Sequence, residues 1–302
     1  MKLLNTLLPL SMTILVMVLT TGCSDSSTPA TPGLSSEFDV QLVSTSDNGE
    51  VLADSTGGVL YIFSPDVHGK SSCVGECVEN WPIFHSGQPR VGSGLEADDF
   101  TVIKRSDGPA QTTFQGWPLY YFSGDEQPGT VNGDGINDAW YVAKANYSVM
   151  IASQQLVGHD DRNYMIDESG RYVEGEGVTS HLVDAEGRTL YIFINDSANT
   201  NNFTAEDFSN NGVWPIYEIE PEAVPSTLNS ELFGSISVYG RQQLTYKGWP
   251  LYYFGQDDMQ RGNTRGVSFS SPGIWPVAQK GMDAAPGYQN NDSSDGPDDP
   301  GY

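Results

Sequence analysis

The sequence predicts an all-β fold built from four repeated antiparallel units, each a hairpin followed by a return strand. Two observations support this prediction. A segment of the form Leu-Tyr-x-Phe-x-x-Asp occurs four times, and each copy is followed by a Trp at a regular distance. The 302-residue chain also contains 33 glycines, 18 prolines and 15 tyrosines, a composition typical of strands and turns rather than of long helices.

We name the four copies units A, B, A′ and B′, in chain order. The Tyr-to-Trp spacing is 20 residues in units A and B and 23 residues in units A′ and B′. Each unit has four repeat residues, which are Tyr61, Phe63, Asp66 and Trp81 in A; Tyr120, Phe122, Asp125 and Trp140 in B; Tyr191, Phe193, Asp196 and Trp214 in A′; and Tyr252, Phe254, Asp257 and Trp275 in B′. Such regularity indicates copies of one structural design.

Physical chemistry accounts for the residue types of the repeat. Alternate residues of a strand point to opposite faces, so Leu60 and Ile62 take one face and Tyr61 and Phe63 take the other. Both faces are apolar or aromatic, which indicates a strand covered on both sides. We expect Asp66 to accept hydrogen bonds from backbone N–H groups where the chain turns away, and the following Trp to pack on the aromatic face.

The order of the units predicts two tandem modules. Units A and A′ share a hairpin lead-in before the Tyr strand, whereas B and B′ share the stretch GWPLYYF. A two-unit module was therefore duplicated as a whole, and we place the modules at residues 37–150 and 151–281. The pattern leaves open whether the four units close into one propeller-like ring or form two separate sandwiches, although short links favour close packing.

The N-terminus has the features of an export signal. A short positive start and an apolar run end at Cys23, preceded by Gly, which resembles the lipobox of bacterial lipoproteins, where the Cys receives acyl chains such as palmitate. We expect a signal peptide at residues 1–22 and lipidation of Cys23, with an ordinary cleaved signal as the alternative. Ser24 beside this Cys favours the outer membrane of a bacterial envelope.

Both ends of the mature chain are polar and low in apolar residues. We expect a flexible tether at residues 23–36 and a disordered acidic tail at residues 282–302. After the signal, no segment approaches the 18 apolar residues that a spanning helix needs. The sequence therefore predicts attachment to the membrane through the N-terminal lipid.

The repeat resembles a bacterial secreted-repeat family of lipoproteins described by the motif Y-x-[FWY]-x-x-D. The resemblance covers about residues 45–280, and Cys73 and Cys77 before Trp81-Pro82 match a Cys-x3-Cys that members often carry. The resemblance implies secretion, usually with a lipid anchor, and no established biochemical activity. It strengthens the predicted location and leaves the chemistry open.

The two cysteines of the body allow two interpretations. Cys73 and Cys77 lie four residues apart with Gly75 between them, so in an oxidising compartment a small disulfide loop is the simpler expectation. The alternative adds His68 and His85 as ligands of copper or zinc. Unit A′ favours the disulfide, because its corresponding stretch has phenylalanines and neither Cys nor His.

Three further features are explained more simply by structure than by binding. The acidic stretch at residues 130–140 lacks a glutamate at the twelfth place of a calcium loop, so we interpret it as a turn. We interpret the four repeat Asp residues as turn chemistry rather than as a ring of carboxylates. We likewise expect the repeat tyrosines to be core residues with local hydroxyl partners, rather than a surface for sugars.

Charge and motifs narrow the function classes. The formal net charge is −25, which argues against binding nucleic acid. None of the nucleophile-elbow, P-loop, zinc-protease or dinucleotide motifs occurs, so we expect no enzyme. We predict a lipid-anchored envelope protein that acts as a non-enzymatic scaffold or binding module for an envelope protein, a polymer or a small ligand. The alternative is a metal-binding or electron-transfer accessory that uses the Cys73 and Cys77 region.

Overall fold

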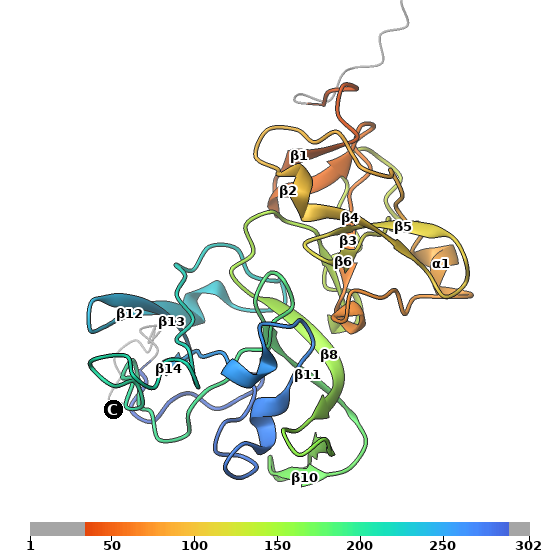
Figure 1. Ribbon diagram of the computed structural model, residues 1–302. Helices are drawn as coiled ribbons and strands as arrows, with labels where there is room; N and C mark the ends of the chain where they lie inside the picture. The colour runs from red at the N-terminus through yellow and green to blue at the C-terminus, as the bar shows by residue number, and fades with distance from the viewer. Residues whose placement is uncertain (1–33, 290–302) are drawn as a thin grey trace, which may run out of the picture. The chain divides into compact units, whose positions relative to one another are not determined.

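The computed structural model describes residues 34–289 (Figure 1). The predicted signal peptide, Cys23 and most of the tether lie outside the described residues, as does the acidic tail from residue 290 onward. The all-β prediction is confirmed within this range, where the chain forms several small antiparallel sheets.

Short strands, with a few single helical turns, make up both halves of the chain. The strands of the first half are β1 (Val40–Thr45), β2 (Gly49–Asp54), β3 (Tyr61–Phe63), β4 (Phe100–Lys104), β5 (Ala110–Phe114), β6 (Trp117–Pro118) and β7 (Trp140–Val142). The strands of the second half are β8 (Met150–Val157), β9 (Asn163–Ile166), β10 (Tyr172–Glu174), β11 (Val178–Val183), β12 (Phe233–Val238), β13 (Arg241–Tyr246) and β14 (Trp249–Pro250). The helical turns are α1 (Cys77–Asn80) and the 3₁₀ turns η1 (Ser64–Asp66), η2 (Ala97–Asp99), η3 (Ile136–Asp138), η4 (Ser230–Leu232), η5 (Gly255–Asp257) and η6 (Arg265–Ser268).

Each unit begins with an antiparallel hairpin. Strands β1 and β2 pair in unit A, and β4, β5 and β6 form the three-stranded sheet of unit B. In the second half β8 pairs with β11, and β12, β13 and β14 repeat the arrangement of unit B. The hairpin of unit A′ differs from the others because β9 and β10 lie between its two strands in the sequence. In the sheet, β8 and β11 are still neighbours, and β9 and β10 extend the sheet on the other side of β8.

The Tyr segments of neighbouring units meet each other in antiparallel bridges at their tyrosines, although only that of unit A forms a strand, β3. Tyr61 N donates to Tyr120 O at 2.8 Å, and Tyr120 N donates to Tyr61 O at 3.0 Å. The same exchange joins Tyr191 and Tyr252, at 2.8 and 2.9 Å. Units A and B therefore meet as an antiparallel pair around one tyrosine couple, and units A′ and B′ do the same.

The segments that follow each repeat Trp cross over to the partner unit. A return strand was predicted in every unit, but in the described residues only unit B forms one, β7, and the other units make isolated bridges there. Strand β7 of unit B pairs with β3 of unit A, so that Trp140 lies opposite Phe63. The corresponding segment of unit A in turn bridges unit B, at Ile83 and Tyr120. The second half repeats this exchange with the bridges Tyr191–Val277 and Ile216–Tyr252. A unit therefore completes its sheet only with its partner, a feature that the sequence pattern did not predict.

The two halves share their largest hydrophobic core, and each half also has an aromatic cluster of its own. Arg261 lies at the junction between the halves. Its Nε donates to Val67 O, its Nη1 donates to Gln115 O at 2.8 Å, and its guanidinium lies 4.9 Å from the Trp117 ring centroid. Trp117 Nε1 donates to Ala185 O at 2.7 Å. The module boundary at residue 150 stays a prediction. Residues from both sides of it pack into one core, so the core does not mark a boundary there.

The packed body continues past residue 281. Ala285 is buried, and its N–H donates to Lys247 O at 2.9 Å. Trp249 Nε1 donates to Asp283 O at 2.9 Å. The part of the expected tail that the structure describes, residues 282–289, is therefore attached to the hairpin of unit B′.

Candidate functional site

The repeat tyrosines and aspartates bind each other across the unit pairs. Tyr61 Oη donates to Asp125 Oδ2 at 2.5 Å, and Tyr120 Oη donates to Asp66 Oδ2 at 2.6 Å. In the second half the bonds are Tyr191 Oη to Asp257 Oδ2 at 2.7 Å and Tyr252 Oη to Asp196 Oδ2 at 2.8 Å. The Tyr of one unit thus always meets the Asp of its partner, so each of these polar groups already has a partner within the protein.

The second carboxylate oxygen of each Asp holds the loop that follows it. Oδ1 accepts one backbone N–H in every unit, from Ser72 in A, Asn132 in B, Asn202 in A′ and Arg265 in B′, at 2.7–2.9 Å. The bond to Oδ1 is the turn role that the sequence predicted for the repeat Asp. The other carboxylate oxygen, Oδ2, accepts the tyrosine hydroxyl of the partner unit.

The repeat tryptophans form stacked pairs. Trp81 and Trp140 lie face to face with ring centroids 3.8 Å apart, and Trp214 and Trp275 lie 3.7 Å apart. Each ring also receives the edge of the Tyr of its own unit, with centroids 5.1–5.5 Å apart. The repeat Phe packs instead on the Trp of the partner unit, as Phe63 does on Trp140 at 4.1 Å.

Burial makes three of the repeat aspartates weak acids. Desolvation raises the pKa of Asp66, Asp196 and Asp257 to about 6, although hydrogen bonds to each carboxylate oppose the shift. A carboxyl whose folded pKa lies above its unfolded value stabilises the fold below the unfolded pKa, and this contribution is lost as pH rises through about 6. His181 acts in the opposite sense, because burial lowers its pKa to about 4.

We expect the protein to be more stable at pH 5 than at pH 7.5. The three carboxyls contribute about 1 kcal/mol each over this range, and together they outweigh the opposite effect of His181 and of His68, whose pKa desolvation also lowers. Urea unfolding at the two pH values measures the difference. Asp257→Asn removes one titrating group and is expected to reduce the difference by about 1 kcal/mol. Asp98→Asn, at an exposed site, should leave it unchanged, and equal stability of the unmodified chain at both pH values would contradict the prediction.

The predicted disulfide is present. Cys73 and Cys77 are bonded, and their Cα atoms lie 5.3 Å apart. Buried Arg105 holds this loop: its Nη2 donates to Cys73 O at 2.7 Å and pairs with Asp107, while its Nη1 donates to Ser71 Oγ at 2.5 Å. The loop is thereby fixed to the hairpin of unit B.

The alternative metal set is not brought together. Both of its sulfur atoms are bonded to each other, and His68 and His85 are exposed. Among residues 34–289 no group of three or more His, Cys, Asp or Glu side chains is placed to hold a metal ion. In the acidic stretch at residues 130–140, Asp134 accepts the N–H of Val142 and Asp138 pairs with Lys280.

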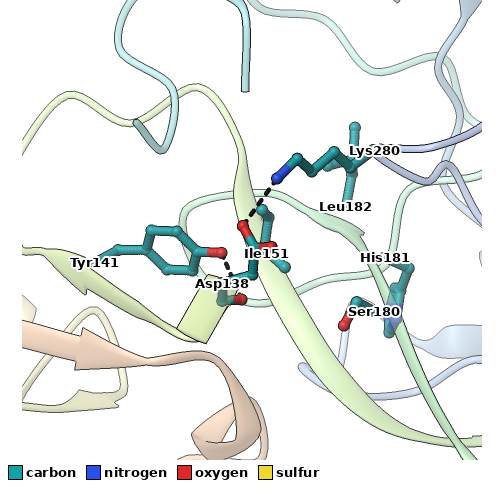
Figure 2. Close-up of a pocket in the computed structure, with 7 residues that line it drawn as sticks. All are labelled: Asp138, Tyr141, Ile151, Ser180, His181, Leu182 and Lys280. Carbon is teal, nitrogen blue, oxygen red and sulfur yellow. Dashed lines mark hydrogen bonds and ion pairs between the residues drawn. The ribbon is translucent and has the colours of Figure 1, made fainter. Parts of the chain in front are cut away.

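A small cavity of about 140 Å³ lies where four segments of the chain meet (Figure 2). Asp138 and Tyr141 come from η3 and β7, and Ile151 comes from β8. The remaining lining residues are Ser180, His181 and Leu182 of β11 and Lys280 near the end of the described chain. The cavity could not be predicted from the sequence, because none of its polar residues lies in a motif that would distinguish it from an ordinary surface or core residue.

Charge and apolar surface are separated within the cavity. Ile151, Leu182 and Tyr141 are buried, and the Tyr141 hydroxyl donates to the backbone oxygen of Asp138 at 2.7 Å. Lys280 Nζ lies 2.8 Å from Asp138 Oδ1, and the side chains of Lys280 and Asp138 are 47% and 66% exposed. Figure 2 shows the lysine side chain reaching toward the aspartate above Ile151. The cavity therefore has an apolar floor and a neutral ion pair beside it.

Three segments match a family model. It is described as a secreted repeat of unknown function, and the matched residues are 42–85, 101–144 and 236–279. These segments correspond to units A, B and B′, each from its hairpin to the segment that follows its Trp. No curated protein and no solved structure matches the chain.

Unit A′ is outside the matched segments. Its hairpin is the one interrupted by β9 and β10, although its Tyr, Phe, Asp and Trp make the same contacts as in the other units. In the described part of the chain, no helix has the length and apolar character needed to span a bilayer. The match to a secreted repeat suggests a location outside the cell or in the envelope.

Proposed function

We propose that this protein is a lipid-anchored envelope protein whose repeats form a rigid, non-enzymatic binding module. The observation that supports this proposal most strongly is that the repeat residues bind each other. Four Tyr–Asp bonds and two stacked Trp pairs use the functional groups that the repeat carries. Such a repeat supports a scaffold, while ligand contacts come from sites grafted onto it.

The anchor is proposed from the sequence, since Cys23 lies outside the described residues. Export would place the Cys73–Cys77 disulfide in a compartment where such bonds persist. One lipidated residue would hold the folded body at a membrane through the tether, and the net charge of −25 would disfavour an anionic lipid surface as the contact of the body itself.

Metabolic labelling with an alkyne analogue of palmitate tests the anchor. The full chain expressed in a Gram-negative host is expected to take up the label and to fractionate with outer membranes. Cys23→Ala should abolish labelling and release the protein, whereas the double variant Cys73→Ser with Cys77→Ser should keep the label. Labelling that survives Cys23→Ala would overturn the proposed anchor.

A further inference from the structure

We propose that the cavity between η3, β8 and β11 binds a small uncharged molecule about the size of one six-membered ring. The inference rests on the proposed function, for which it names a ligand class. Three properties of the cavity support it: its volume, its apolar floor and the balance of charge beside it.

The volume fits one ring. The cavity measures about 140 Å³, close to the roughly 150 Å³ of an engineered apolar cavity that takes up benzene. It is partly open to solvent, so a ligand can enter without unfolding the sheet. Larger molecules would have to displace Ile151 or Leu182, both of which are packed in the main core.

The floor favours apolar atoms. The side chains of Ile151, Leu182 and Tyr141 are at most 4% exposed. The Tyr141 hydroxyl is occupied by the Asp138 carbonyl. Burial lowers the pKa of His181 to about 4, so this ring is neutral at pH 7 and adds no charge. A ring entering the cavity therefore gains apolar contact and meets no unpaired charge in the floor.

The ion pair selects against charged ligands. A carboxylate would have to replace Asp138 as the partner of Lys280, and it would also approach a protein of net charge −25. An ammonium group would have to replace Lys280. An uncharged molecule leaves the pair intact, and one hydroxyl group on it can bond either to the ammonium or to the free carboxylate oxygen.

Ser180 offers a further hydrogen bond. Ser64 Oγ donates to Ser153 Oγ at 3.1 Å, and Ser153 Oγ lies 2.8 Å from Ser180 Oγ. When Ser153 donates its hydroxyl hydrogen to Ser180, the Ser180 hydroxyl can donate its own hydrogen to an acceptor on the ligand. The predicted ligand is therefore an apolar ring with at most one hydroxyl group, for which phenol is a suitable probe.

Isothermal titration calorimetry on the full chain in lipid nanodiscs tests the proposal, with empty nanodiscs as the blank. At pH 7 phenol is uncharged, whereas benzoate is an anion and benzylamine is a cation. We expect phenol to bind with a dissociation constant of about 0.1–1 mM, and benzoate and benzylamine to bind at least tenfold more weakly. Absence of phenol binding to the folded protein would overturn the proposal.

Two charge variants test the location. Asp138→Asn leaves Lys280 without its partner and is expected to raise benzoate affinity at least tenfold; the positive φ of 51° at this position also suits Asn. Lys280→Met should do the same for benzylamine. Asp98→Asn, on η2 away from the cavity, serves as the control. Unchanged ligand preference in both charge variants would place the phenol site elsewhere.

Filling variants complete the test. Ile151→Phe fills the floor, and Ser180→Phe blocks the cavity from an exposed position that tolerates a larger side chain; each should reduce phenol binding at least tenfold. Phenol binding that survives in a folded Ser180→Phe protein would overturn the proposal. The Cys23→Ala chain, titrated without nanodiscs, should bind phenol with the same affinity, so loss of the anchor and loss of the ligand site give distinguishable results.

Discussion

Trp214→Ala is expected to lower the free energy of unfolding by about 3–5 kcal/mol. The indole is 1% exposed and lies 3.7 Å from Trp275, ring centroid to centroid. It also contacts the edge of Tyr191 and the tilted ring of Phe254. Alanine removes all three contacts and leaves a cavity between the two units, because the crossed segments that follow each Trp limit how far the backbone can close.

Urea unfolding followed by near-ultraviolet circular dichroism measures this loss. Val178→Ala is the control, since that side chain is 76% exposed on the same half and should change stability by less than about 0.5 kcal/mol. The stacked indoles are also expected to give an exciton couplet that weakens in Trp214→Ala. A loss below about 1 kcal/mol would mean that the stacked pair is not a principal stabilising contact.

The sequence predicted the parts of the fold that depend on local pattern. Alternation around Tyr61 and Tyr191 predicted strands covered on both faces. Both tyrosines are fully buried, but only Tyr61 lies in a strand, β3, whereas Tyr191 makes isolated bridges. Hairpin lead-ins with Gly predicted that the chain turns back just before the Tyr segments of units A and A′, and the bridges Ala53–Val59 and Val183–Thr189 close these turns. These features follow from the preferences of neighbouring residues, which one sequence contains directly.

The pairing of units could not be predicted in this way. The Tyr–Asp bonds join residues 54–66 positions apart, and the repeat offers each Tyr several chemically equal aspartates. Only the three-dimensional crossing of the segments that follow each Trp decides that Tyr61 meets Asp125 of unit B. A local pattern gives no information on that choice.

The candidate cavity could not be predicted from the sequence for a related reason. Asp138 has the character of a turn residue, Lys280 that of a surface residue near the acidic tail, and Ile151 that of a core residue. None carries a motif, and Asp138 and Lys280 lie 142 positions apart in the chain. Their meeting is a property of the packing between the two halves.

In each unit, one loop residue donates its backbone N–H to the repeat Asp. The residue that follows this donor differs between units A and A′ on one side and units B and B′ on the other. Units A and A′ place Cys73 and Phe203 there, whereas units B and B′ place Gly133 and Gly266. Phe203 packs edge-on against Trp275 with ring centroids 4.8 Å apart, and Cys73 is buried in the aromatic cluster of the first half. Apolar packing by Phe203 thus takes the place that the disulfide has in unit A.

Glycine is required at this position in units B and B′. The Gly266 N–H donates to Tyr191 Oη at 3.2 Å, and a Cβ there would lie 2.6 Å from Tyr191 Cε1 and 2.8 Å from Trp214 Cη2. Both rings are held, by the Asp257 bond and by the Trp275 stack. Gly266→Ala is therefore expected to destabilise the fold by about 3 kcal/mol, at the upper end of overpacking effects.

Gly212→Ala provides the matched control. This glycine lies in unit A′, has open space within 4 Å of the place that an alanine Cβ would take and has no positive φ, so the same chemical change should alter stability by less than about 0.5 kcal/mol. Urea unfolding of the two variants compares them directly. Gly133→Ala should behave like Gly266→Ala, because its Cβ would lie 2.9 Å from Tyr61 and Trp81. Equal stability of Gly266→Ala and Gly212→Ala would show that the Tyr and Trp rings can yield, and the rigid unit pair on which the scaffold role depends would then be wrong.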